Sequence, residues 1–248
     1  MSYKYALNQN FENFKESLVD IKRYFELSKN SIHKARNEIK TIIFEDKELV
    51  VKSFKIPNII NKIIYTFFKD SKAKKSYDNS MRIIEFVPKP IGYIEFKRFC
   101  LIDESYFVSE NFKYDFTIRE PLIDDSFEDK STVLKAFAKF TLALHENGIF
   151  HLDYSPGNIL IKRESDNYTF KIVDINRMRF GSLSLEERLE NFAKLWAKND
   201  DLQIIIKEYA KLFNSDEESC VKIALKYSQA HKDRKNRKKR LRGVDVVD

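Results

Sequence analysis

The sequence has few cysteines and no long apolar run, and each shortage excludes a class of protein. Cys100 and Cys220 are its only cysteines among 248 residues, so neither a disulfide framework nor a cysteine-rich zinc site is expected. No apolar run approaches the roughly 18–20 residues that a membrane-spanning helix needs. The N-terminal residues lack the apolar core of a secretion signal. We therefore expect a protein of the reducing cytoplasm.

The positive charge is concentrated near the end of the sequence. Residues 231–242 contain eight Lys or Arg residues and one acid, Asp233, which equals the formal net charge of +7 for the whole chain. An anionic partner is therefore expected at this segment. Its two interpretations are a solvated tail without a partner and a binding segment for an anionic membrane or RNA. Because few aromatic residues lie within 231–242 for base stacking, RNA is the less favoured of the two anionic partners.

The apolar pattern changes from mainly strands in the first half to mainly helices in the second. A composition of 43% hydrophobic and 33% charged residues suits two small folded lobes. The first half predicts a helix over 9–29, a hairpin of 41–44 with 49–54, helical structure over 58–84, and strands at 92–98 and 106–109. The second half predicts helices over 131–147, 202–213 and 217–230, a helix after a Ser184–Glu187 capping box, and a hairpin of 159–162 with 169–173.

This order of elements predicts an α+β, two-lobed fold. The N-terminal lobe, mainly β with an N-terminal helix, is expected to span residues 1–110 and to bind a nucleotide. A compact helical C-terminal lobe is expected at 111–230, followed by the basic tail at 231–248.

The most informative segment is His-Leu-Asp-Tyr-Ser-Pro-Gly-Asn-Ile-Leu at 151–160, followed by Ile-Val-Asp-Ile-Asn at 172–176. It places the carboxylate of Asp153, then the amide of Asn158, then a second carboxylate, Asp174, after a short apolar hairpin. The spacing H-x-D-x-x-x-x-N followed by D is typical of kinase catalytic and metal loops. The ordered set therefore predicts a phosphoryl-transfer site that uses ATP and Mg²⁺.

Each member of this set has its own expected role. Asp153 is the expected catalytic base, which takes the proton of the acceptor hydroxyl. Asn158 and Asp174 are the expected ligands of Mg²⁺, which prefers hard oxygen donors. Taken alone, each Asp would be interpreted as a turn residue, but their occurrence in register with the Asn favours the catalytic interpretation. His151 is expected to brace the loop through hydrogen bonds, and His145 to be a packed histidine of the core.

A lysine within an apolar strand is the expected nucleotide ligand. Lys52 lies in Leu-Val-Val-Lys-Ser-Phe at 49–54, where its burial costs free energy unless the ammonium meets an anion. We expect Lys52 to bind ATP phosphates, and a strand-edge lysine that reaches solvent is the alternative. The kinase lysine pairs with a helical acid, for which Asp78 is the candidate and Glu85 the fallback. A solvated helix face is the other interpretation of Asp78.

The glycine-rich loop that would cover the phosphates is missing. The chain has five glycines and none before Gly92, although glycine lets backbone N–H groups approach a phosphate closely. The corresponding loop would lie at 34–37, where Arg36 would meet phosphate by charge instead. A surface turn is the alternative interpretation.

Together these segments resemble the Kdo/WaaP-type lipopolysaccharide kinase family, a branch of the protein-kinase-like fold. The resemblance is carried by residues 149–160 and by Val-Asp-Ile-Asn-Arg at 173–177, where Asp-x-x-Arg replaces the Asp-Phe-Gly of other kinases. Weaker matches lie at 36–40 and 51–54, so the resemblance covers about residues 30–200.

The resemblance implies transfer of phosphate from ATP to a sugar hydroxyl, of Kdo or a heptose, in the lipopolysaccharide inner core. It implies that Lys52 binds ATP, that Asp153 is the base, and that Asn158 and Asp174 bind Mg²⁺. A lipid-linked acceptor would place the enzyme on the inner face of the inner membrane, with the basic tail as its contact. Two rivals stay open: a Rio-like protein kinase, which shares H-x-D-x-S-x-x-N, and a pseudokinase that binds a partner, which Asp78 and the missing glycine favour.

Overall fold

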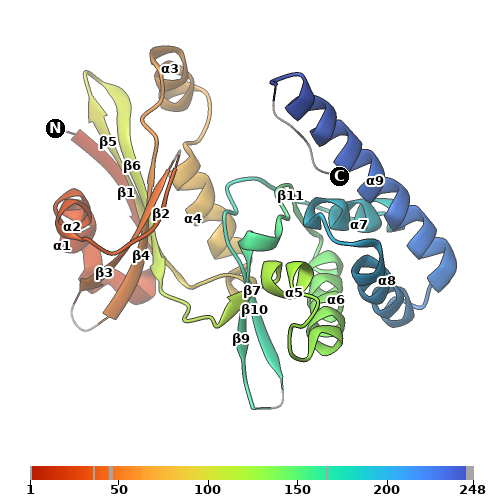
Figure 1. Cartoon of the computed structure of the whole chain (residues 1–248). Helices are drawn as coiled ribbons and strands as arrows, with labels where there is room; N and C mark the ends of the chain where they lie inside the picture. The colour runs from red at the N-terminus through yellow and green to blue at the C-terminus, as the bar shows by residue number, and fades with distance from the viewer. Residues whose placement is uncertain (1, 36, 45–46, 166, 244–248) are drawn as a thin grey trace. The chain divides into compact units, whose positions relative to one another are not determined.

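The structure is a computed structural model that describes residues 2–35, 37–44, 47–165 and 167–243, and its chain divides into two units. One unit contains the residues up to Lys113 together with Asp174–Asn176, and the other contains Tyr114–Val173 and the residues from Arg177 onward. Both contain helices and antiparallel strands, as Figure 1 shows, so the mixed composition of the fold is confirmed. Among the helices of the described residues, none has both the length and the hydropathy to cross a bilayer.

The first unit is built on a six-stranded antiparallel sheet in the order β1-β5-β6-β4-β3-β2 (Figure 1). Its strands are β1 (Ser2–Leu7), β2 (Ser31–Lys34), β3 (Glu38–Phe44), β4 (Lys47–Phe54), β5 (Pro90–Arg98) and β6 (Leu101–Glu110). The expected hairpin, β3 with β4, is confirmed, and so are the two strands that became β5 and β6. The sequence did not predict β1 and β2, because β2 is exposed throughout and β1 only partly buried, so neither shows the alternation of a half-buried strand.

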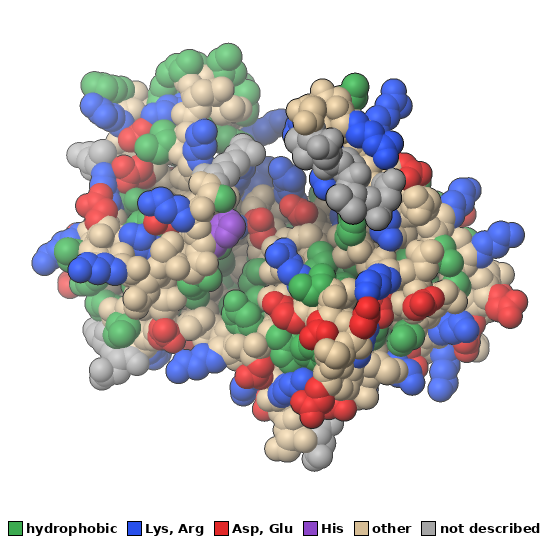
Figure 2. All heavy atoms as spheres, in the orientation of Figure 1, with side chains coloured by type: hydrophobic (Ala, Val, Ile, Leu, Met, Phe, Trp, Pro, Cys, Tyr) green, Lys and Arg blue, Asp and Glu red, His purple; other side chains and the backbone are tan. Residues whose placement is uncertain are grey.

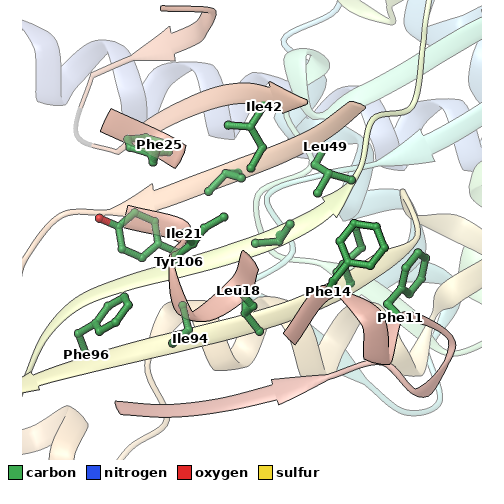
Figure 3. Close-up of a cluster of buried hydrophobic side chains, with 13 residues drawn as sticks. Phe11, Phe14, Leu18, Ile21, Phe25, Ile42, Leu49, Ile94, Phe96 and Tyr106 are labelled. Atoms are coloured by element: carbon green, nitrogen blue, oxygen red, sulfur yellow. The ribbon is translucent and has the colours of Figure 1, made fainter. Parts of the chain in front are cut away.

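Short helical pieces at the N-terminus cover one face of this sheet. They are the 3-10 helix η1 (Gln9–Phe14), α1 (Lys15–Val19) and α2 (Ile21–Leu27), so the prediction of a single helix over 9–29 is wrong. The chain leaves helical geometry at Phe11 and again at Asp20 (φ −90°, ψ 11°), a residue type that is a weak former of helix interiors. The apolar positions were nevertheless correct, and the core in Figure 3 contains Phe14, Leu18, Ile21, Phe25, Ile42, Leu49, Ile94 and Tyr106.

The helical structure expected over 58–84 is present as two separate helices. They are α3 (Ile59–Phe67) and α4 (Lys72–Arg82), followed by the 3-10 helix η2 (Ile84–Phe86). The side chain of Ser71 caps α4 by accepting a hydrogen bond from a backbone N–H, so a new helix begins there. Buried residues join α4 to the sheet face opposite the N-terminal helices: Phe54, Ala73, Tyr77 and Tyr93.

The second unit combines small sheets with helices. Its strands are β7 (Phe116–Thr117), β8 (Ile149–His151), β9 (Ile159–Arg163), β10 (Tyr168–Ile172) and β11 (Met178–Phe180), paired as β10-β9-β7 and β11-β8. Its helices are α5 (Arg119–Ile123), α6 (Lys130–Glu146), η3 (Pro156–Asn158), α7 (Leu185–Asn191), η4 (Phe192–Leu195), α8 (Asn199–Leu212) and α9 (Glu217–Arg240). The predicted helix stop at Gly148 (φ +65°) and the capping box at the start of α7 are both confirmed.

Helix α9 continues ten residues beyond the end expected at residue 230. Its first half buries Cys220, Ala224 and Ser228, and its second half contains most of the basic segment. The charges up to Arg240 are therefore carried by a folded helix, whereas the sequence alone set them apart as a tail.

Gly92 marks a place where β5 passes very close to β1. A Cβ atom at this position would lie 2.7 Å from Ala6 O and 3.0 Å from Leu18 Cδ2. The carbonyl cannot retreat without disturbing the β1–β5 pairing, so we expect Gly92→Ala to lower the free energy of unfolding by about 1–3 kcal/mol. Urea denaturation measures this loss, and Ser31→Ala on exposed β2 is the control, with an expected change below about 0.5 kcal/mol. Equal stability of the two variants would contradict the close packing.

Candidate active site

The loop at 151–158, hereafter the Asp153 loop, carries two of the expected site residues in the second unit. Asn158 Nδ2 donates a hydrogen bond to Asp153 O (2.9 Å), and Ser155 N donates to the same carbonyl (2.8 Å). Pro156 occupies the first turn of η3, where its missing N–H leaves no hydrogen bond unmade. The Asp153 side chain is 45% exposed, with Arg177 Nη1 4.0 Å away. These two hydrogen bonds thus fix the loop around the carbonyl of Asp153, while the carboxylate of Asp153 stays accessible to solvent.

His151 braces the Asp153 loop through hydrogen bonds, as the sequence predicted. Its side chain is buried, and its Nδ1 accepts a hydrogen bond from Asp153 N (3.0 Å). Because Nδ1 is the acceptor, the proton is on Nε2, which donates to Val173 O (3.0 Å). The imidazole therefore links the start of the Asp153 loop to the end of the β9–β10 hairpin.

A buried polar network fixes His151 to the helices around it. Asn191, the last residue of α7, donates from Nδ2 to His151 O (3.0 Å) and accepts at Oδ1 from His145 Nε2 (3.2 Å). The other ring nitrogen of His145 accepts from the Tyr209 hydroxyl (2.9 Å), which also accepts from Arg188 Nη1 (3.4 Å). His145 is thus a packed core histidine, as predicted, and its hydrogen bonds connect α6, α7 and α8.

In the first unit, Lys52 and Asp174 form an ion pair with 2.7 Å between Nζ and Oδ1. Val51 belongs to the core beneath the N-terminal helices, so strand alternation places Lys52 on the other face of the sheet. There its Nζ lies 5.4 Å from the ring centre of Phe54, and its side chain is only 12% exposed. The carboxylate offsets the cost of burying this ammonium group.

Asp174 has a left-handed backbone conformation (φ +57°), which is uncommon for a residue other than glycine. Its Oδ1 also accepts from Asn176 Nδ2 (2.5 Å), and the next carbonyl, Ile175 O, accepts from Asn79 Nδ2 (2.6 Å) on α4. Non-glycine residues held in such conformations cluster at ligand and catalytic sites. Sequence reasoning missed Asn79, and its only signal was its place on the expected helix beside Asp78.

The expected partner of Lys52 on α4 has another partner in the structure. Asp78 pairs with Lys74 one turn earlier on the same helix (2.6 Å between Oδ2 and Nζ), so the expected Lys52–Asp78 pair is not formed. A pair at i and i+4 on a helix is reached without rearrangement, which is why the local partner is favoured. Arg36 lies outside the described residues.

The β9–β10 hairpin joins the two parts of the motif along the backbone, and its predicted pairing is confirmed. Ile159 lies opposite Ile172, and one step further Val173 N donates to Asn158 O (2.9 Å). Asp174 is the residue that follows Val173. The chain therefore passes from the backbone pairing at Asn158 directly into the strained Asp174.

Sequence reasoning also missed a lysine beside the Asp153 loop. Lys194 on η4 donates from Nζ to Leu152 O (2.5 Å). Burial lowers the pKa of Lys194, the negative charge of Asp153 partly offsets this, and the charges of Arg234 and Lys235 on α9 lower the pKa further. No motif in the sequence marks Lys194, because only the packing of η4 brings it to the loop.

The basic half of α9 packs along η4 and the residues that follow it. Lys232 Nζ donates to Ala197 O (2.7 Å), and Lys239 Nζ lies 5.6 Å from the ring centre of Trp196. The Trp196 ring also meets His231 edge-on, with 6.1 Å between ring centres. These contacts hold the positive charge of α9 beside the element that carries Lys194.

The mixed α and β fold, with its six-stranded antiparallel sheet, has a counterpart among solved structures. A solved structure described as "WaaP in complex with acyl carrier protein" is similar to this chain with a TM-score of 0.62 and 12% sequence identity, over 93% of this chain and 98% of that one. No family model and no curated protein matches the sequence. At this identity the likeness establishes the fold. WaaP also gives its name to the family that residues 149–160 and 173–177 of this chain resemble.

The burial of His145 predicts a specific loss of stability in acid. Burial lowers the pKa of His145 to about 4, from 6.5 for a free histidine. Between these values the unfolded chain binds a proton that the native chain does not, so the free energy of unfolding falls as pH drops from about 6.5 towards 4, by up to about 3 kcal/mol. Urea denaturation at pH 7 and pH 5 measures the difference. His145→Gln should show a smaller pH effect than the parent protein, and equal slopes would contradict this assignment.

Proposed function

We propose that the protein is an ATP- and Mg²⁺-dependent kinase that phosphorylates a sugar hydroxyl, of Kdo or a heptose, in the lipopolysaccharide inner core. Two contacts of the motif residues carry the proposal: Asn158 donates a hydrogen bond to the carbonyl of Asp153, and Lys52 forms an ion pair with Asp174. We infer that the two units are the two lobes of a kinase. The likeness in fold to WaaP supports kinase-like activity, and the choice of sugar rests on the sequence resemblance alone.

Asp153 is the proposed general base. Its carboxylate accepts the proton of the acceptor hydroxyl as the new oxygen–phosphorus bond forms and the bond from the γ-phosphorus to the leaving ADP breaks, a contribution of about 10²–10⁴-fold in rate. The hydrogen bonds from Asn158 to its carbonyl and from its own N–H to His151 limit the movement of the loop. A base held in this way keeps its orientation towards the acceptor at little entropic cost.

The oxygen donors of the motif fit Mg²⁺, which takes hard ligands and keeps several waters. Asn158 Nδ2 donates to Asp153 O, so Oδ1 is the amide atom that would hold the metal, and Asp174 would supply the carboxylate. Lys52 would contact the nucleotide phosphates, and Mg²⁺ would neutralise the charge of the transferred phosphate. Arg36 and Asp78 stay predictions as further nucleotide contacts.

The basic half of α9 is the proposed contact with an anionic membrane surface. A lipid-linked acceptor lies at the inner face of the inner membrane, and each Lys or Arg near such a surface contributes about 1 kcal/mol. The helix carries its charges beside η4, whose Lys194 contacts the Asp153 loop. The same helix would therefore bring the proposed base close to the membrane-borne sugar.

Substitutions in the motif separate catalysis from nucleotide binding. We expect Asp153→Asn to lower phosphate transfer to core glycolipid by about 10²–10⁴-fold, because the base is lost. The rise in Tm on adding ATP and Mg²⁺ should persist in this variant. Asp174→Asn should lose both the activity and the Mg²⁺-dependent part of the Tm rise, and exposed Asp200→Asn is the control for loss of one acid.

Three outcomes would argue against the proposal. Near-normal activity of Asp153→Asn would remove the assigned base. Phosphate incorporated into protein and not into glycolipid would favour a Rio-like kinase. An unchanged Tm with ATP and Mg²⁺, together with no transfer to any core sugar, would favour a pseudokinase.

Removing charge from α9 tests the membrane contact. Lys238 and Arg240 are exposed on the helix, so the double variant Lys238→Gln/Arg240→Gln should fold normally. We expect about tenfold weaker binding to vesicles that contain anionic lipid at low salt, and a much smaller difference at high salt. The control is Lys207→Gln/Lys211→Gln on α8, which removes the same charge elsewhere. Equal weakening by both pairs would show that overall charge, and not α9, governs binding.

A further inference from the structure

Helix α3 is attached to the first unit through its polar side. Lys62 and Thr66 lie one turn apart on this side. Lys62 Nζ pairs with Asp103, and Thr66 Oγ1 accepts a hydrogen bond from Ile102 N (2.9 Å), both on β6. These contacts fix the rotation of α3 about its own axis.

Other polar residues on the same side of α3 face a hollow beside the sheet. Asn61 and Tyr65 line a cavity of about 260 Å³ together with Ile102 and Ser105 of β6. Although α3 is strongly amphipathic in sequence, none of its residues is buried. The helix thus reverses the usual arrangement, in which the apolar side of a surface helix faces the core.

The opposite side of α3 presents large apolar side chains to solvent, and Figure 2 shows hydrophobic side chains gathered over this helix. At 100° per residue, Ile59, Ile60, Ile63 and Phe67 fall on one side of the helix. Their exposed fractions are 62%, 65%, 42% and 66%. Three further apolar residues outside α3 are exposed: Ile56 (45%) and Phe68 (77%), which flank the helix in the sequence, and Phe99 (86%) in the turn that precedes β6, the strand to which α3 is attached. An exposed apolar helix side of this kind marks an interaction site.

The segment that contains α3 is rich in positive charge. Residues 55–75 contain a single acid, Asp70, and six lysines: Lys55, Lys62, Lys69, Lys72, Lys74 and Lys75. Two of these are paired with acids, Lys62 with Asp103 and Lys74 with Asp70 and Asp78. Arg98 lies beside Phe99, with its guanidinium 5.4 Å from the ring centre. A second copy of the chain would bring like charges together, which is unfavourable. An apolar side with bulky Ile and Phe side chains and flanking lysines fits the interface of an anionic bilayer.

We propose that α3, together with Phe68 and Phe99, inserts its apolar side into the surface of an anionic lipid bilayer. Lysines such as Lys55 and Lys69, both exposed, contact the lipid headgroups beside the inserted side chains. The inference deepens the proposed membrane association, but it uses residues of the first unit only and needs neither catalysis nor α9. It differs from the α9 contact in its physical basis, because burial of apolar surface persists at high salt while charge attraction is screened.

Vesicle sedimentation with the full chain tests the insertion. Vesicles of phosphatidylcholine and phosphatidylglycerol are used in about 0.5 M NaCl, where the electrostatic contribution of α9 is suppressed. We expect Ile60→Glu/Phe67→Glu to lower the partition coefficient by about tenfold or more, since two apolar side chains no longer leave water. The matched control is Leu27→Glu/Ile123→Glu, two positions that are each 68% exposed outside α3, and its expected change is below about twofold. Circular dichroism checks that both variants are folded.

A fluorescence measurement reports insertion directly. Phe67→Trp in a Trp196→Phe background places the only tryptophan on α3. Its emission should shift to shorter wavelength on addition of the vesicles and should be quenched by lipids brominated on the acyl chain. Emission that stays at the wavelength of a water-exposed indole would overturn the proposal.

Two further outcomes decide between occupants of the surface. If the parent protein and Ile60→Glu/Phe67→Glu sediment equally, or if the parent ignores vesicles and forms a dimer that this variant dissociates, lipid is not the occupant. If no sugar kinase activity is found but vesicle binding depends on α3 as described, the insertion stands and the proposed function fails.

Discussion

The hydrogen bonds of the Asn191 side-chain amide are the interactions on which the arrangement of the Asp153 loop depends. It donates to the carbonyl of His151 and accepts from His145, so one side chain joins the loop to the helices of its unit. A buried donor or acceptor left without a partner costs about 1–3 kcal/mol, which strongly disfavours other arrangements of this region. His145 must be neutral to fill its place, because one ring nitrogen donates while the other accepts from Tyr209. The position of Asp153 therefore depends in part on groups that take no part in the proposed chemistry, namely His145, His151 and Asn191.

The Lys52–Asp174 ion pair has a comparable role in the first unit. Its partners are 122 residues apart in the sequence, and each is placed by its own backbone: Lys52 by strand alternation, Asp174 by a left-handed turn. Asn79 secures that turn from α4 by binding the carbonyl of Ile175. In the proposed nucleotide site, the Lys52 ammonium exchanges the Asp174 carboxylate for a phosphate, and the Asp174 carboxylate exchanges the ammonium for a divalent cation. The proposed nucleotide site uses this exchange and needs no glycine-rich loop to supply the charge.

Two helices present surfaces that the folded chain itself leaves uncovered. Helix α9 presents positive charge and is held in place by Lys232 and the ring of Trp196. Helix α3 presents apolar side chains, because its polar side is occupied by Asp103 and the backbone of β6. Both surfaces suit an anionic lipid surface, one through charge and the other through burial of apolar area. Because salt screens only the first, the two contributions can be measured independently.

Local patterns predicted much of the fold and of the candidate site. The β3–β4 and β9–β10 hairpins, helix α6 with its stop at Gly148, the capping box of α7 and the bracing role of His151 all depend on residues close together in the chain. The periodicity over 9–29 identified the buried side chains but not the departures from helical geometry at Phe11 and Asp20. The strands β1 and β2 escaped notice because their exposure leaves no alternation to detect.

The sequence by itself determined the order and spacing of Asp153, Asn158 and Asp174. The short-range pairing of β9 with β10 then places Asn158 opposite Val173, the residue before Asp174. Only the tertiary structure decided that Lys52 pairs with Asp174 and not with Asp78, that Asn79 and Lys194 contact the motif segments, and that α3 turns its apolar side outward. Helix periodicity predicts that a side chain shares a face with others, but it does not specify which surface that face meets. That choice depends on partners far away in the chain, such as Asp103 on β6 for α3.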